Sequence, residues 1–207
     1  MSRSVAALTL GSATRPLSAR QLDTINRLVD AAVIEVRSVG FAGLTVRNVA
    51  ARAGVAPATA YTYFGSKEHL VGEVFWRRLR ALAPTRIDRR MTVGHRVAIA
   101  LREVAMLVAD EPELSAACTT ALLVNEPQVK RLRDRIGGNI RHRLESALGD
   151  DNDPVVVGAL ELAYSGAMLQ AGTGHLSYDE LGDRLTEAAE LMLATRPTGA
   201  RPMGTKR

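Results

Sequence analysis

The sequence predicts an all-α protein of about nine helices, with a small N-terminal three-helix unit ahead of a larger helical body. Three observations lead to this prediction. Apolar residues recur at helical spacing through most of the chain, no segment alternates as a half-buried strand does, and proline or a capping residue precedes most expected helices. At 46% hydrophobic residues in a chain of 207, there is ample material for a core.

The first expected helix is long, amphipathic and ends near Gly40. Ser18 and Gln21 form a capping box at its start, because each side chain can satisfy a backbone N–H of the other residue. An apolar stripe follows, made of Leu22, Ile25, Val29, Ala32, Val33 and Val36. A helix with one such stripe covers a neighbouring apolar surface, and we expect the next two helices to supply it.

Two short helices joined by a glycine turn are expected between residues 45 and 64. Thr45 suits the N-cap of a helix that runs to Ala53, and Gly54 stands where a left-handed residue ends it. Pro57 suits the first turn of the second helix. The expected exposed residues of that helix are Ala58, Thr59, Tyr61, Thr62 and Tyr63. Two short helices joined in this way form a helix-turn-helix, which fits the major groove of DNA.

A further helix is expected from residue 67 to about Leu82. Ser66 can cap it, and Lys67 in its first turn places an ammonium beside N–H groups that also favour an anion, so the pair predicts a phosphate clamp. Phe64 is expected in the core. Tyr61 and Tyr63 have two interpretations, as core aromatics or as residues whose hydroxyl reaches a phosphate, and we favour phosphate contact for Tyr63.

Four short motifs follow one another here: Gly54-Val55, Thr59, Tyr61-Thr62-Tyr63-Phe64 and Lys67-Glu68-His69-Leu70. At these spacings, residues 18–82 resemble the DNA-binding domain of the TetR family of transcriptional regulators. The resemblance implies phosphate contacts from Thr45, Thr59, Tyr63 and Lys67. It implies base contacts from Arg47 and the start of the second short helix.

The expected DNA-contacting residues are therefore Thr45, Arg47, Ala56, Pro57, Ala58, Thr59, Tyr61, Thr62, Tyr63 and Lys67. The chain departs from the family pattern at Ala56 and Ala58, where the family often has serine and glycine. A hydroxyl cap and some close approach of the backbone are thereby lost.

Five more helices are expected at residues 92–109, 112–123, 127–148, 154–172 and 178–194. Pro112, Pro127 and Pro154 each stand at a helix start, Asp153 is a ready N-cap, and Ser177 with Glu180 forms a second capping box. The segment 154–172 is apolar nearly all round, so it must be covered on several sides. We expect a homodimer through the last two helices; burial of this helix within one monomer is the alternative.

Charge divides the chain unevenly. Residues 1–90 carry a net charge of +8, residues 91–195 carry −7, and residues 196–207 carry +4. The N-terminal part therefore faces a polyanion. We predict a flexible arm (1–17), a DNA-binding helix-turn-helix domain (18–65), an effector-binding and dimerisation domain (66–195) and a flexible tail (196–207).

The family resemblance also implies an effector pocket enclosed by the middle helices. Candidate lining residues are Met106, Leu107, Cys118, Leu122, Leu123, Leu144, Tyr164 and Met168, although residues of these types more often belong to the plain core. The arrangement around Glu111-Pro112-Glu113-Leu114 and the last two helices resembles lipid-responsive actinobacterial members of the family, which implies a small apolar effector. The basic residues of segment 127–148 form either a solvated face or a site for an anion, and Gly137-Gly138 marks either a kink or close packing.

No catalytic, cofactor or metal site is expected. The four histidines lack metal-ligand spacing, no Cys-x-x-Cys or phosphate-binding glycine loop occurs, and the single cysteine, Cys118, suits a buried apolar position. No apolar run approaches the ~20 residues of a membrane span, so a cytoplasmic protein is expected. The sequence thus predicts a homodimeric, sequence-specific repressor, released from a palindromic DNA operator by a small effector. The alternative is a helical small-molecule-binding or protein-interaction module that does not bind DNA.

Overall fold

The computed structural model describes residues 17–194, and this part of the chain contains nine α-helices, one short 3-10 helix and no strand. The all-α class is confirmed. The helices are α1 (Ala19–Gly43), α2 (Val46–Arg52), α3 (Pro57–Tyr63), α4 (Lys67–Ala81), α5 (Val93–Ala105), α6 (Pro112–Leu123), α7 (Pro127–Leu148), α8 (Pro154–Gly172) and α9 (Tyr178–Ala194), with the 3-10 helix at Gly149–Asp151. Apart from Leu17, the predicted N-terminal arm lies outside the described residues, as does the whole C-terminal tail.

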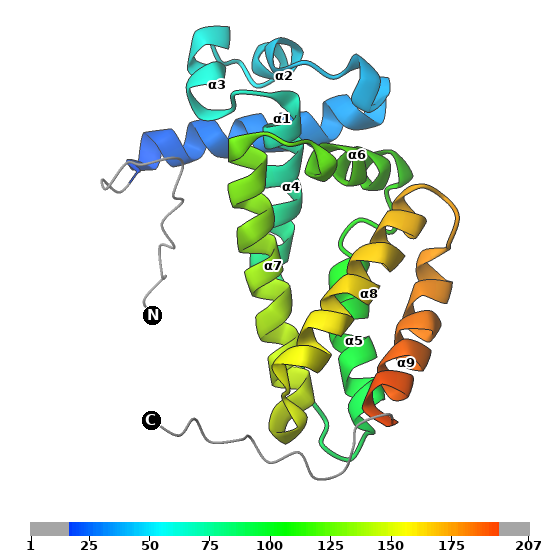
Figure 1. The fold of residues 1–207 in the computed structure, drawn as a ribbon. Helices are drawn as coiled ribbons and strands as arrows, with labels where there is room; N and C mark the ends of the chain where they lie inside the picture. The colour runs from blue at the N-terminus through cyan, green and yellow to red at the C-terminus, as the bar shows by residue number, and fades with distance from the viewer. Residues whose placement is uncertain (1–16, 195–207) are drawn as a thin grey trace.

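The short helices α2 and α3 lie across one side of α1, and α4 descends from them into the body (Figure 1). In the body α4 packs against α6 and α7, and α6 also packs against α1. At the far end α5 packs against α7 and α9, and α8 packs against α9. One hydrophobic cluster runs through all of these contacts, so the helix-turn-helix and the body are packed together. The predicted boundary at residue 65 stays a prediction.

Helix starts follow the predicted capping residues closely. The Ser18 hydroxyl accepts from the Gln21 N–H at 3.3 Å while the Gln21 side chain accepts from the Ser18 N–H at 2.8 Å. Pro112, Pro127 and Pro154 each occupy the first helical position. Proline is favoured there because its missing N–H would have had no helical partner.

Two helix ends differ from expectation. α1 continues past Gly40 to Gly43, because Gly40 takes a φ of 68° and lets a further turn follow a kink. α5 ends at Ala105 instead of residue 109. Beyond it the chain tightens into turns, where the Leu107 and Glu111 N–H groups donate to carbonyls three residues back.

Arg143 fits neither interpretation of the basic residues on α7, which were a solvated face or a site for an anion. Its side chain is buried, and its guanidinium donates to the carbonyls of Ala83 and Leu82 at 3.0 and 2.8 Å, and to the Asn139 side chain at 3.0 Å. A buried guanidinium is tolerated only when its donors are paired. Arg143 therefore fixes the connection between α4 and α5.

Within residues 17–194, no other element covers one apolar face of α8. Val155 and Leu162 are 79% and 78% exposed, and Leu169 is also exposed. By length and composition α8 is long and apolar enough to cross a membrane, which was not expected, yet it packs against α6, α7 and α9. Burial among the described residues of one monomer covers only part of α8, and the homodimer stays a prediction.

Candidate nucleic-acid interface and internal cavity

The turn between α2 and α3 is built as the sequence predicts. The Thr45 hydroxyl accepts from the Asn48 N–H at 3.0 Å and caps α2. Gly54 takes a φ of 62°, which glycine adopts without steric cost, and the next N–H, that of Val55, donates to Ala50 at 2.9 Å. Val55 is buried beneath the turn, so the angle between α2 and α3 is held by packing.

The predicted contact residues on α3 share an exposed face. Ala60 and Phe64 are fully buried against the core, which confirms the prediction for Phe64. The opposite face is exposed and consists of Ala56, Pro57, Ala58, Thr59, Tyr61 and Thr62. Tyr63 is half-buried and packs against the core, while no hydrogen bond of its hydroxyl is recorded in the described part of the chain. Both interpretations of Tyr63 are therefore compatible with its position.

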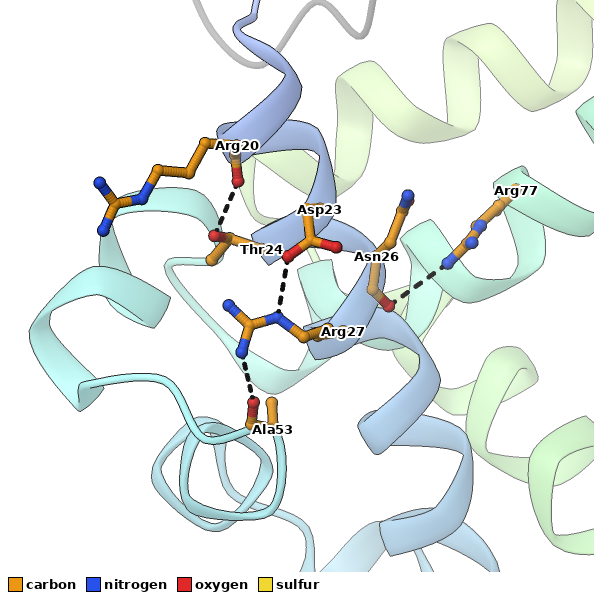
Figure 2. Close-up of polar contacts among 7 residues, drawn as sticks. All are labelled: Arg20, Asp23, Thr24, Asn26, Arg27, Ala53 and Arg77. Carbon is orange, nitrogen blue, oxygen red and sulfur yellow. Dashed lines mark hydrogen bonds and ion pairs between the residues drawn. The ribbon is translucent and has the colours of Figure 1, made fainter.

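Two arginines fasten α1 to its neighbours. Arg27 donates to Asp23 at 3.1 Å and to the carbonyl of Ala53 at 3.1 Å, which ties α1 to the turn after α2 (Figure 2). Arg77 of α4 donates to the Asp30 carboxylate at 3.1 Å and reaches the Asn26 carbonyl (Figure 2). These side chains hold the helices at fixed angles.

Within residues 17–82, three arginines have no side-chain hydrogen bond or ion pair: Arg20, Arg47 and Arg80, the last at the body end of α4. Arg47 is exposed on α2. Arg20 extends from the first turn of α1, where only its backbone carbonyl is bonded (Figure 2), and lines a polar hollow with Gln21, Thr59 and Tyr63. In contrast, Arg52 donates to Glu35 at 2.5 Å. Arg20 was not among the predicted DNA-contacting residues. Its position in the first turn of α1, close to α3, could have indicated it.

Lys67 is partly engaged within the protein. Its Nζ donates to the carbonyl of Phe41 at 2.9 Å and lies 4.5 Å from the centroid of the Phe41 ring. The ammonium thus sits at the carboxyl end of α1, where the helix dipole favours a cation. Whether it also contacts a phosphate stays a prediction.

We expect Arg47→Ala and Lys67→Ala to weaken binding to DNA in different ways. Lys67→Ala loses one phosphate contact and should flatten the slope of log affinity against log salt by about 0.9, whereas Arg47→Ala loses a base contact and should reduce the preference for the operator over a shuffled duplex. Only Lys67→Ala should also lower the melting temperature, since only Lys67 is bonded to α1. Fluorescence anisotropy with both duplexes at four salt concentrations and thermal unfolding measure these effects. A lower melting temperature with an unchanged slope would remove Lys67 from the phosphate contacts.

Ionisable side chains are buried along the face of α4 that meets the body. Glu73 is 3% exposed, and one of its carboxylate oxygens has no recorded partner within the described residues. Burial raises the pKa of Glu73 to about 7, although Arg135, Arg80 and Arg77 act in the opposite direction. His69, one turn earlier, has its pKa lowered by burial and then by Arg131.

Glu73 should make the protein less stable as the pH rises. Below its ordinary pKa of 4.5 the carboxyl is protonated in both the folded and the unfolded state. Between pH 4.5 and about 7 the unfolded chain releases the proton and the folded protein keeps it, so the free energy of unfolding falls. Above this window the loss is complete, at up to about 3 kcal/mol.

We therefore expect Glu73→Gln to raise the free energy of unfolding by about 2 to 3 kcal/mol at pH 8 and to change it little at pH 4.5. Urea denaturation at both pH values measures this. His69 contributes with the opposite sign, because its lowered pKa removes stability as the pH falls below 6.5, and the variant retains that dependence. An equal gain at both pH values would show that the ionisation of Glu73 is not the cause.

Glu111 joins three helices at the start of α6. Its carboxylate accepts from Arg37 of α1 at 2.7 Å and pairs with Arg78 of α4 at 2.8 Å. Burial alone would raise the pKa of Glu111, but the bonds from Arg37 and Arg78 outweigh it and lower the pKa. The same charge thus holds α1 and α4 to the body.

A partly open cavity of about 290 Å³ lies among α4, α6, α7 and α8. Five of the predicted lining residues border it, namely Cys118, Leu122, Leu123, Tyr164 and Met168. The structure places Met106 and Leu107 in the turn after α5 and Leu144 in the core, none of them among the lining residues. Lining residues not predicted are Phe75, Val108, Ser115, Thr119, Arg133, Ile136, Gly137, Ile140, Ser165, Leu169 and Tyr178.

The surroundings of Gly137 are relevant to the two interpretations of Gly137-Gly138, a kink or close packing. A Cβ added there would meet no atom within 4 Å, so close packing does not require glycine. Since Gly137 borders the cavity, its missing side chain leaves room inside.

Burial raises the pKa of the Cys118 thiol to about 12, so the thiol stays protonated near neutral pH. Among residues 17–194, no group of three or more His, Cys, Asp or Glu residues is placed to hold a metal ion.

Comparison with known proteins decides the family. Residues 28–74 match the family described as bacterial regulatory proteins, tetR family. An HTH-type transcriptional regulator of Mycobacterium tuberculosis is 49% identical over 177 residues, which span 84% of this chain and 83% of that protein. The chain belongs to the TetR family. Its members are transcriptional regulators and not enzymes, so this TetR-family regulator is a DNA-binding protein with a helix-turn-helix.

More distant relatives share the fold over most of the chain. The HTH-type transcriptional repressor KstR of Rhodococcus jostii is 27% identical to this TetR-family regulator over 203 residues, or 93% of this chain and 92% of that protein. The crystal structure of a TetR transcriptional regulator from Rhodococcus sp. RHA1 is 21% identical, with a TM-score of 0.66 over 82% of this chain and 97% of that one. The alternative of a module that does not bind DNA is thereby set aside.

Proposed function

We propose that this protein is a homodimeric, cytoplasmic repressor that binds a palindromic DNA operator and leaves it when a small apolar effector enters the cavity. The observation that carries the proposal is the continuity of α4. This helix begins at Lys67, beside the helix-turn-helix, and contributes Phe75 to the wall of the cavity. A molecule in the cavity therefore touches the helix that positions the DNA-binding unit.

The proposed DNA surface combines α3 with the exposed cations around it. Thr59, Tyr61 and Thr62 present hydroxyl groups on the exposed face of α3, and its small residues permit close approach to the bases. Arg47 and Arg20 supply guanidinium groups that form no ion pair within the described residues. Thr45, Tyr63 and Lys67 complete the proposed phosphate contacts, and Ala56, Pro57 and Ala58 form the amino end that enters the groove.

The proposed dimer interface is the uncovered face of α8 and α9. Val155, Leu162 and Leu169 on α8 and Leu191 on α9 are exposed apolar side chains. Contiguous exposed apolar surface on a water-soluble protein marks an interaction site. A second copy with the same face buries it symmetrically, and it brings two α3 helices to one palindrome.

The proposed route from effector to DNA runs through α6 as well as α4. α6 contributes Cys118 and Leu122 to the cavity wall, and Glu111 at its start is bonded to α1 and α4. A ligand that displaces α6 or α4 must strain these bonds, which changes the distance between the two α3 helices of the dimer.

The test is binding to the DNA upstream of the protein's own gene, measured by gel shift at physiological ionic strength against a shuffled duplex of equal composition. We expect a preference of at least about 1,000-fold for the upstream region, the lower end of the range of specific over non-specific binding. Equal binding to both duplexes would contradict operator recognition in that region.

A further inference from the structure

The cavity wall contains one buried polar group that the folded chain leaves unused. Tyr164 is 4% exposed, and its hydroxyl makes no hydrogen bond with the described residues. Buried hydroxyls are nearly always paired, because an unpaired one has lost its hydration without compensation. Tyr164 borders the cavity, so a molecule bound there lies against a residue whose buried hydroxyl lacks a partner, and a small rotation of the side chain would bring the two together.

The neighbouring hydroxyls are already paired with protein groups. Ser115 and Tyr178 are hydrogen-bonded to each other, and Thr119 donates to the Ser115 carbonyl at 3.0 Å. The Tyr164 phenol lies near enough to that of Tyr178 for the two to interact electrostatically. The polar end of the cavity thus offers one unused hydroxyl among satisfied ones.

Charge in the cavity does not favour an ionic ligand. Among the described residues that border it there is no carboxylate, and the Cys118 thiol stays neutral. The Arg133 guanidinium borders it, but Nη1 donates to the carbonyls of Leu122 and Val124, both at 2.7 Å. Arg133 therefore caps the carboxyl end of α6, and an anion there would meet two carbonyl oxygens.

We infer that the cavity binds an uncharged, mainly apolar molecule whose single hydroxyl or carbonyl group pairs with the Tyr164 hydroxyl. The inference rests on the proposed effector-sensing function and names the chemical class of the effector. A cavity of about 290 Å³ is roughly twice the engineered cavity of about 150 Å³ that holds benzene. The ligand therefore has on the order of ten to twelve non-hydrogen atoms.

Three molecules of this size separate the possibilities: 2-naphthol, naphthalene and 2-naphthoate. Each is titrated by calorimetry at pH 7 into the full-length protein without DNA. We expect 2-naphthol to bind about five- to tenfold more tightly than naphthalene, which lacks the hydroxyl, and 2-naphthoate to bind at least tenfold more weakly than 2-naphthol.

Tyr164→Phe removes only the hydroxyl. We expect it to weaken 2-naphthol about five- to tenfold, to leave naphthalene unchanged, and to leave the melting temperature of the ligand-free protein equal or higher. Gly137→Leu fills the cavity from α7 and should weaken both neutral ligands. Tightest binding by 2-naphthoate, no binding by any of the three, equal effects of Tyr164→Phe on 2-naphthol and naphthalene, or full binding by Gly137→Leu would each overturn the inference.

The proposed repressor function is measured separately, with the DNA upstream of the gene. Tyr164-dependent binding of 2-naphthol without release of that DNA would contradict the proposed release and support the ligand class. Binding to that DNA with no binding of 2-naphthol would support the DNA-binding function and overturn the ligand class.

Discussion

Leu162→Glu should convert the protein to a monomer and weaken its binding to the operator at least 100-fold. The side chain is 78% exposed in the middle of α8, so the substitution costs the single chain little. In the proposed dimer it places two buried carboxylates in an apolar interface, without partners. A monomer binds only one half-site and loses the gain in affinity that comes from binding two at once. For linked binding modules this gain reaches 100-fold or more.

Sedimentation velocity and fluorescence anisotropy measure the two consequences. Met91→Glu is a matched control, because Met91 is also an exposed apolar residue but lies in the connection between α4 and α5. It should remain dimeric and bind the operator as the parent does. A Leu162→Glu protein that stays dimeric would place the interface elsewhere.

Arg143→Ala should lower the free energy of unfolding by about 4 kcal/mol. The carbonyls of Leu82 and Ala83 would lose their charged donor, and the space vacated between α7 and the connection after α4 would lose its packing. Since whole domains are stable by about 5–15 kcal/mol, this is a large share.

Urea denaturation with an unchanged slope provides the measurement. Arg131→Ala is the control, because Arg131 is an exposed arginine of the same helix, and it should change the free energy of unfolding by less than about 0.5 kcal/mol. Arg143→Lys should fall between the two, since an ammonium lacks the planar fork that reaches several acceptors. Similar values for Arg143→Ala and Arg131→Ala would contradict the role assigned to Arg143.

Local chemistry explains why the helices were predictable. Their starts depend on residues adjacent in sequence: Ser18 bonds to Gln21, Thr45 bonds to Asn48, and prolines take the first helical positions. The fully buried Phe64 followed from its place at the end of α3. Gly54 followed from the backbone conformation that the turn requires.

Contacts between distant segments explain what was missed. Arg143 and the carbonyl of Leu82 are 61 residues apart, and nothing near either residue indicates that they meet. The spacing of apolar residues predicts which face of a helix is buried. It does not predict which neighbouring helix each residue of that face contacts. For that reason Tyr178 and Ile136 border the cavity unexpectedly, while Leu144, two turns beyond Ile136 on the same stripe, is buried in the core.

The internal pairing of the N-terminal arginines changes what the formal charge of that region means. Five of the eight arginines in residues 17–82 are paired with carboxylates, so most arginines of this part of the chain serve to brace helices; they are Arg27, Arg37, Arg52, Arg77 and Arg78. Among these eight arginines, the guanidinium groups of Arg20, Arg47 and Arg80 stay unpaired, and Arg20 and Arg47 lie near α3. Recognition of one DNA sequence over another then depends mainly on uncharged atoms, because short side chains of α3 contact the bases in the groove. Salt hardly weakens contacts between uncharged groups.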